Sequence, residues 1–314
     1  MERLKVAVMG AGAVGGYFGG RLALAGHEVH FVARGEHLRA LQAEGLRVRS
    51  ARGDFHVRVH ATGDPREVGP VDLLLFTVKT YDLEAAAEAA RPMVGPQTLV
   101  LPLQNGVDAP DYLAEVYGVD RVLGGSCKIE VTVAAPGVIE HPSPLASIAF
   151  GELSGGLSPR VERLREVFQA AGGAEVEASP DIRRVLWEKL IFLATLSAFT
   201  TATGLPIGPV RDHPPTRELL ARMLGEVTAV ARAEGIALPD DHPDRVLAFI
   251  LGLPGTMKSS MQRDRERGRR LEVEAIQGAV VRRARRHGIP VPVTETLYAI
   301  LSLWRDGSPQ VPAR

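Results

Sequence analysis

The chain has 314 residues, of which 45% are hydrophobic and 24% charged, which is enough for two globular, soluble domains. Its formal net charge is zero, so it lacks the electrostatic attraction that dominates non-specific binding to nucleic acids and to anionic membranes, and we expect neither partner. The single cysteine, Cys127, excludes an internal disulfide framework, and glycines interrupt the first apolar run too early for a signal peptide; both features predict a cytoplasmic protein.

The first part of the chain alternates short apolar runs with helical segments. The apolar runs lie at residues 4–10, 27–34, 71–79 and 97–105, and the helical segments at 14–26, 81–94 and 161–173. Further strands are expected over 121–152 and 174–178. Continuous apolar runs are typical of strands buried on both faces of a parallel sheet. We therefore expect a doubly wound, Rossmann-type α/β domain over residues 1–178.

The pattern becomes helical near residue 178. Ser179, Pro180 and Asp181 predict a helix start, with serine as the N-cap, proline at the first helical position and an acid in the first turn. Helices are then expected at residues 185–204, 216–235, 242–252, about 256–287 and 293–307. The first is apolar, but its second half is too polar for a membrane span, so we expect a core helix that stops at Gly204. These features predict an all-α domain over residues 179–314, whose apolar helices are also compatible with a homodimer.

A glycine motif follows the first predicted strand and opens a helix. It consists of Gly10, Ala11, Gly12, Ala13, Val14 and Gly15. In a GxGxxG motif the glycines permit a tight turn and close approach of the backbone to a pyrophosphate, and the N-terminus of the following helix attracts negative charge. The motif in this context predicts dinucleotide binding.

Three residues at the ends of later strands bear on the cofactor and the site. Arg34 ends the second strand, where NAD-specific sites tend to place an acid, and an arginine there favours NADP(H) through its 2′-phosphate. The alternative is a surface arginine, with Glu36 in the acidic role. Lys79 ends the third strand and Asn105 the fourth, at the edge where ligands of such sheets bind. For Asn105-Gly106 alone, a simple turn is the better interpretation.

Lysine is rare in this chain. Only five of the 37 lysine and arginine residues are lysines, and Lys189 stands just before a long uncharged run. A lysine at the border of a core can simply extend its ammonium group to solvent.

Together these residues resemble the ketopantoate reductases, the NADPH-dependent 2-dehydropantoate 2-reductase family. The similarity covers nearly the whole chain. The matching residues are Gly10–Gly15, Arg34, Val78-Lys79, QNG at 104–106, LWEKL at 186–190, SSM at 259–261, Glu272 and RRARRHGIPVP at 282–292. The resemblance implies that Lys79 and Arg34 bind the cofactor.

The resemblance also implies catalytic roles. Lys189 would be the general acid, Glu272 would hold Lys189 and the cofactor ribose in place, and Asn105 and Ser260 would contact the substrate. Hydride transfer to a ketone leaves an alkoxide that needs a proton, and a lysine can supply one because its pKa can be tuned by partial desolvation, unlike that of arginine.

The chain departs from the family on the substrate side. The family usually has asparagines four and eight residues after the lysine, and another in an Asn-Gly after the helix. This chain has Leu193, Ser197 and Ile207 at these positions. Leu193 and Ser197 are therefore candidate substrate-binding residues with fewer hydrogen-bonding groups. We expect NADPH-dependent reduction of a 2-keto acid, with conversion of ketopantoate to pantoate in pantothenate biosynthesis as the first reaction to test and a less polar keto compound as the alternative.

Two other classes of function stay open. The departures are compatible with a regulatory protein that binds NADP(H) without catalysis. The arginine-rich segment at 263–270 suggests nucleic-acid binding, but its interspersed acids and lack of aromatic residues favour a surface segment with ion pairs. We expect no metal site, because Asp240, His242 and Asp244 more simply start a helix.

Overall fold

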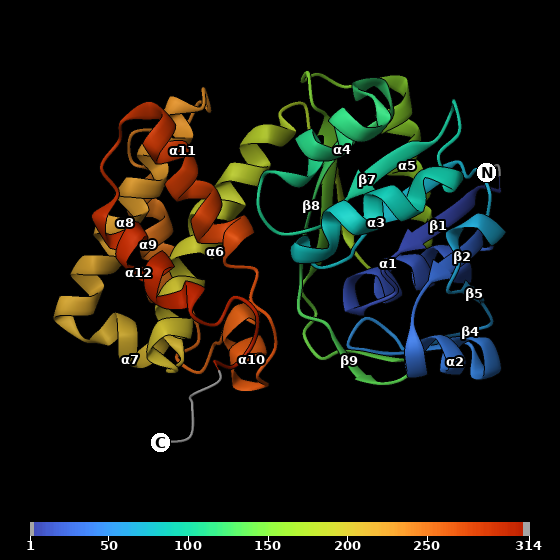
Figure 1. Cartoon of the computed structure of the whole chain (residues 1–314), viewed down its shortest axis with the longest axis horizontal. Helices are drawn as coiled ribbons and strands as arrows, with labels where there is room; N and C mark the ends of the chain where they lie inside the picture. The colour runs from blue at the N-terminus through green and yellow to red at the C-terminus, as the bar shows by residue number, and fades with distance from the viewer. Residues whose placement is uncertain (1–2, 310–314) are drawn as a thin grey trace. The chain divides into compact units, whose positions relative to one another are not determined.

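The computed structural model describes residues 3–309, which form two compact units (Figure 1). The first unit holds residues 3–104 and 109–185, and the second holds 105–108 and 186–309. The second unit thus includes a four-residue segment whose neighbours on both sides in sequence belong to the first. Residues 310–314, at the end of the expected second domain, lie outside the described residues.

The first unit is built on a five-stranded parallel sheet. Its strand order is β5 (His60–Thr62), β2 (Glu28–Val32), β1 (Lys5–Met9), β6 (Leu73–Phe76) and β7 (Leu99–Pro102). The four apolar runs that predict buried strands form β1, β2, β6 and β7. The strand order reverses at β1, which pairs with β2 on one side and β6 on the other, so the carboxyl ends of β1 and β6 form the switch point where such sheets bind ligands.

Helices and two smaller sheets complete this unit. The helices are α1 (Ala13–Leu24), α2 (Gly35–Glu44), α3 (Leu83–Ala90), α4 (Ala109–Tyr117) and α5 (Pro159–Ala171), with short 3₁₀ helices η1 (Pro65–Glu67), η2 (Thr80–Asp82), η3 (Arg91–Met93) and η4 (Val119–Arg121). One small sheet has the order β4 (Phe55–Val57), β3 (Leu46–Ser50), β10 (Val138–His141), β9 (Thr132–Ala135), and the other β12 (Glu175–Ala178), β11 (Ala146–Glu152), β8 (Leu123–Ile129). Helix α1 packs closely on the main sheet because it is glycine-rich: a Cβ at Gly19 would lie 2.6 Å from the side chain of Val8.

Within its described residues, the second unit contains helices and no strand. These are α6 (Ile182–Thr203), which begins at the end of the first unit, α7 (Ile207–Asp212), α8 (Pro214–Ala233), α9 (His242–Gly252), α10 (Ser260–Glu266), a π-helical turn η5 (Glu274–Gly278), α11 (Ala279–His287) and α12 (Pro292–Ser302). A parallel-sheet domain followed by a helical one confirms the predicted fold class.

Helix α6 behaves as the core helix that the sequence predicts. It is the one helix among the described residues that is long and apolar enough to cross a membrane, but 67% of its most apolar stretch is buried inside the structure. It ends at Thr203, and Gly204 adopts a left-handed conformation with φ of 72°. A buried helix in a folded domain meets the same length and composition test as a membrane span, so the two expectations, core burial and a stop at Gly204, are confirmed.

The predicted N-cap of α6 is wrong by two residues. The helix begins at Ile182, and the backbone N–H of Arg184 donates to Oδ1 of Asp181 at 3.1 Å. Asp181 therefore caps the helix, whereas the Ser179 hydroxyl accepts a hydrogen bond from the backbone of Asp181 at 3.2 Å, ahead of the helix. A carboxylate next to the first turn also matches the positive end of the helix dipole.

The single helix expected over 256–287 is also wrong. Helix α10 ends at Glu266, and an irregular segment separates it from η5 and α11. Gly268 has φ of 65° within this segment, a conformation that ends a helix. Glu272 consequently lies outside regular helix. Gly288, with φ of 65°, ends α11 as expected.

Candidate functional site

The glycine motif lies at the switch point of the main sheet. Gly10 has φ of 99°, and a Cβ at this position would lie 2.7 Å from the backbone nitrogen of Val78. The Thr77 hydroxyl donates to the Gly10 carbonyl at 2.7 Å and so ties the end of β6 to the end of β1. A Cβ on Gly15 would collide with Gly10 and Thr77, whereas one on Gly12 would meet nothing within 4 Å. Gly10 and Gly15 thus allow tight packing, and Gly12, exposed before α1, leaves the backbone accessible to a phosphate.

Arg34 and Lys79 follow strands on opposite sides of β1. Arg34 is the exposed N-cap residue of α2, and within residues 3–309 its guanidinium has no hydrogen-bond or ion-pair partner. Glu36 lies in the first turn of α2 and pairs with Arg39. Lys79 is partly buried at the N-cap of η2, just beyond β6. Both cations therefore stand at the carboxyl edge of the sheet, where a dinucleotide phosphate can be held.

Lys189 is partly buried on α6, beside the buried Trp187 and Leu190. Within the described part of the chain, its ammonium makes no hydrogen bond or ion pair, and Glu272 therefore does not bind it directly in this structure. Glu272 is 6% exposed, and its Oε2 accepts a hydrogen bond from Nδ2 of Asn105 at 3.4 Å. Two candidate residues separated by 167 positions thus meet in the second unit.

The positions where family asparagines are replaced differ in burial. Leu193 is partly exposed on α6. Ser197 is fully buried, and its hydroxyl accepts a hydrogen bond from Nε2 of Gln277 at 2.9 Å. Ile207 is also fully buried, and its backbone N–H donates to the carbonyl of Met257 at 3.0 Å. Only Leu193 of these three has solvent access, so Ser197 and Ile207 pack within the helical unit.

Ser260 is exposed in the first turn of α10, and its neighbour Ser259 fixes that turn. The Ser259 hydroxyl accepts from the backbone of Gln262 at 3.1 Å and bonds to the Thr200 hydroxyl at 2.9 Å. Ser259 therefore caps α10 and attaches it to α6. Ser259 lies in the SSM match of the sequence, where no role is predicted for it, although a serine directly before a helical run is an N-cap signal.

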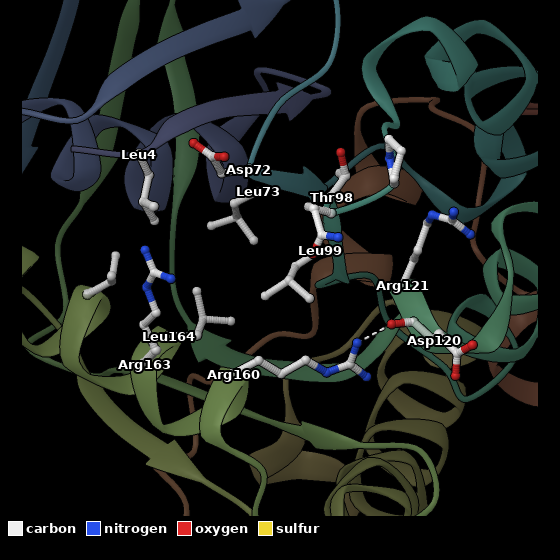
Figure 2. A pocket seen from close by; sticks show the side chains of 13 residues that line it. Leu4, Asp72, Leu73, Thr98, Leu99, Asp120, Arg121, Arg160, Arg163 and Leu164 are labelled. Atoms are coloured by element: carbon white, nitrogen blue, oxygen red, sulfur yellow. Dashed lines mark hydrogen bonds between the residues drawn. The ribbon is translucent and has the colours of Figure 1, made fainter. Parts of the chain in front are cut away.

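A cavity of about 280 Å³ lies elsewhere in the first unit (Figure 2). Its lining includes Leu73 and Leu99, the first residues of β6 and β7, so it lies at the amino edge of the sheet, opposite the glycine motif. Its Arg160 is held by Glu152, with Nε–Oε1 at 2.7 Å, and donates to the carbonyl of Asp120. This cavity is therefore separate from the candidate site.

Comparison with known proteins identifies relatives over nearly the whole chain. The sequence model of the family described as ketopantoate reductase PanE/ApbA matches residues 6–155, and that of its C-terminal domain matches residues 181–304. The uncharacterized oxidoreductase YkpB of Bacillus subtilis is 32% identical, with 96% of this chain and 99% of the relative covered. The 2-dehydropantoate 2-reductase of Halobacterium salinarum is 34% identical, with coverage of 97% and 100%. The crystal structure of a PanE/ApbA family ketopantoate reductase from Ralstonia eutropha is 37% identical and superposes with a TM-score of 0.88, covering 96% of this chain and 98% of that one.

Proposed function

We propose that this chain, a member of the ketopantoate reductase PanE/ApbA family and therefore an oxidoreductase, reduces a 2-keto acid with NADPH. Ketopantoate is the first candidate substrate. The observation that carries this proposal is the hydrogen bond between Asn105 and Glu272. Both residues have a role in the family pattern, and they meet in the unit that also contains Lys189.

The first unit supplies the residues that would hold the cofactor. The backbone at Gly12 and the N-terminus of α1 would bind the pyrophosphate, since this glycine leaves the turn open and the helix end is electropositive. Arg34 would pair with the 2′-phosphate, and Lys79 would add a second positive charge at the same edge of the sheet. When bound, NADPH supplies the hydride for the carbonyl carbon.

The second unit supplies the proton and the substrate contacts. Lys189 donates a proton from its ammonium group to the alkoxide oxygen, which leaves a neutral amine that regains a proton from solvent. The Asn105 side chain uses Nδ2 for Glu272, so its carbonyl oxygen remains to accept from the substrate or cofactor. Ser260, exposed at the start of α10, offers a hydroxyl. The buried Glu272 carboxylate accepts this hydrogen bond from Asn105.

A second candidate substrate is a less polar 2-keto acid. Leu193 is partly exposed where the family has an asparagine, and a leucine cannot pair with a substrate hydroxyl. An apolar group at the corresponding part of the substrate would contact Leu193 without leaving a polar group unpaired.

A spectrophotometric screen tests the proposal. Purified protein is given NADPH or NADH with a panel of 2-keto acids that includes ketopantoate and apolar analogues. We expect NADPH oxidation with at least one of them, and a loss of about 100-fold or more in kcat for Lys189→Ala. Lys128→Ala is the control, because Lys128 is an exposed lysine on β8 of the first unit.

Two results would count against this function. Absence of turnover with every keto acid, despite tight NADPH binding, would favour the regulatory alternative. Full activity of Lys189→Ala would remove this lysine as the proton donor.

A further inference from the structure

An ion-pair cluster holds the short segment 105–108 within the second unit. Nη2 of Arg283 lies 2.6 Å from Oδ1 of Asp108, and Nη2 of Arg282 lies 3.2 Å from Oδ2. Each carboxylate oxygen of Asp108 thus binds a different guanidinium. Asp108 is three residues from Asn105, so its anchoring restricts where Asn105 can lie.

Arg283 is itself fixed on three sides. Its side chain is only 12% exposed, and its Nε lies 2.9 Å from Oε2 of Glu234. The guanidinium stands over the ring of Trp187 at 5.6 Å, two residues before Lys189 on α6. A planar guanidinium can bind two carboxylates and stack on a ring at once, whereas a lysine ammonium cannot. Arg283 therefore connects the 105–108 segment to α6 and to Glu234, the C-cap residue of α8.

The remaining contacts of residues 105–108 show that the ion pairs of Asp108 are the main hold on this segment. Gly106 has φ of 90°, and a Cβ there would lie 2.6 Å from the carbonyl oxygen of Ala275, so the backbone passes close to η5. The hydrogen bond from Asn105 to Glu272, at 3.4 Å, is longer than the usual 2.7–3.2 Å and is weak by itself. The charge-assisted bonds of Asp108 are the stronger hold on the segment.

We propose that Arg283, assisted by Arg282, is a positioning residue that acts through Asp108 to place the Asn105 side chain against Glu272. The inference rests on the proposed function for its effect on catalysis. Its structural part, that the arginine pair orders residues 105–108, is independent of any substrate. The two adjacent arginines of the C-terminal signature thus share Asp108 but differ in their second partner, which is Glu274 at 3.3 Å for Arg282 and Glu234 for Arg283.

Hydrogen exchange of the ligand-free protein tests the structural part. Asp108→Asn keeps the size of the side chain but removes the charge, and we expect exchange of the 105–108 backbone amides to become about tenfold faster. Asp111→Asn is the matched control, because Asp111 pairs with Arg183 at 2.7 Å in the first unit and has no bond to the segment. Unchanged exchange in Asp108→Asn overturns the proposal. Arg282→Gln, at a more exposed arginine, replaces Asp108→Asn if that variant does not fold.

A double-mutant cycle tests the effect on catalysis. Asp108→Asn is expected to lower kcat/KM about tenfold, and to have no further effect in an Asn105→Ala background. Arg283→Lys should resemble Asp108→Asn. Additive losses would mean that Asp108 acts independently of Asn105 and would overturn the positioning role. If no keto acid is reduced, the proposed function fails, while the exchange experiment still decides whether the arginines order the segment.

Discussion

Arg34 allows the choice of cofactor to be tested with little disturbance of the fold. Its guanidinium is exposed and has no hydrogen-bond or ion-pair partner within residues 3–309, and its backbone is ordinary extended chain, with φ of −135°. Arg34→Ala therefore removes no internal bond. We expect the free energy of unfolding to stay within about 0.5 kcal/mol of the wild-type value.

The expected loss in binding follows from the bond that Arg34 would make. A hydrogen bond to a charged group is worth about 1.5–3 kcal/mol, which corresponds to roughly a tenfold to 150-fold rise in the dissociation constant for NADPH. NADH lacks the 2′-phosphate, so its dissociation constant should change by less than about twofold. Fluorescence titration with both nucleotides, at one fixed ionic strength because exposed charges are screened by salt, measures the two constants.

The control for Arg34→Ala is Arg39→Ala. Arg39 is an exposed arginine one turn further along α2, and it already pairs with Glu36. Arg39→Ala should leave the dissociation constants for NADPH and for NADH unchanged. Equal weakening of NADPH and NADH by Arg34→Ala would refute the reasoning, because Arg34 would then contact a group that the two cofactors share. If the wild-type protein prefers NADH and Glu36→Gln loses that preference, the result would support the alternative in which Glu36 takes the acidic role of NAD-specific sites.

Two further predictions concern stability. Gly106→Ala should lower the free energy of unfolding by more than about 1 kcal/mol, because residue 106 has a φ of 90° and the alanine Cβ would press on the Ala275 carbonyl. Gly225→Ala, in α8, should raise it by about 0.5–1 kcal/mol, because a Cβ there would meet no atom within 4 Å; thermal denaturation measures both changes. Hydrogen bonds from Arg160 hold the pKa of Glu152 below its ordinary value of 4.5 despite partial burial; this stabilisation is complete above that value and is lost as the pH falls through the lowered pKa. Glu152→Gln should therefore be less stable than wild type at pH about 7, and in urea denaturation the difference should shrink as the pH falls below the ordinary pKa of 4.5. An equal difference at neutral and at acidic pH would contradict this assignment.

Local physical rules predicted the main parallel sheet and the glycine turn at its carboxyl edge. The apolar runs were long enough to be buried on both faces of a sheet, and strands of that kind pair in parallel. The glycine motif lay where only glycine fits, since Gly10 and Gly15 face the end of β6. These features depend on neighbours within a few residues or on the regular geometry of a βαβ unit, so they can be read from sequence.

The helical half was predicted less well where competing local signals were present. Residues 256–287 continue a helical composition across Gly268, and only the left-handed conformation of that glycine reveals the break. Ser179 and Asp181 are both good N-caps, and the structure uses Asp181. Amino-acid composition alone did not show where the helix would break or which of the two residues would cap α6.

The segment 105–108 could not have been predicted from local pattern at all. Asp108 and Arg283 are ordinary charges in their own surroundings, and 175 positions separate them; their contact exists only because the second unit includes four residues from the first half of the chain. The same holds for Asn105 and Glu272. Long-range pairs of this kind are set by the tertiary fold, which periodicity and capping rules do not describe.

Burial distinguishes Leu193 from Ser197, the two candidate substrate-binding residues of α6. Helical spacing places Leu193 and Ser197 on the same face of the helix as Lys189 and gives no reason to distinguish these two departures from the family. The structure separates them, because Ser197 is fully buried with its hydroxyl bound to Gln277, whereas Leu193 is partly exposed. The Ser197 hydroxyl is thus engaged in packing within the helical unit. We therefore expect Leu193, and not Ser197, to be the departure that affects the polarity of a substrate bound beside Lys189.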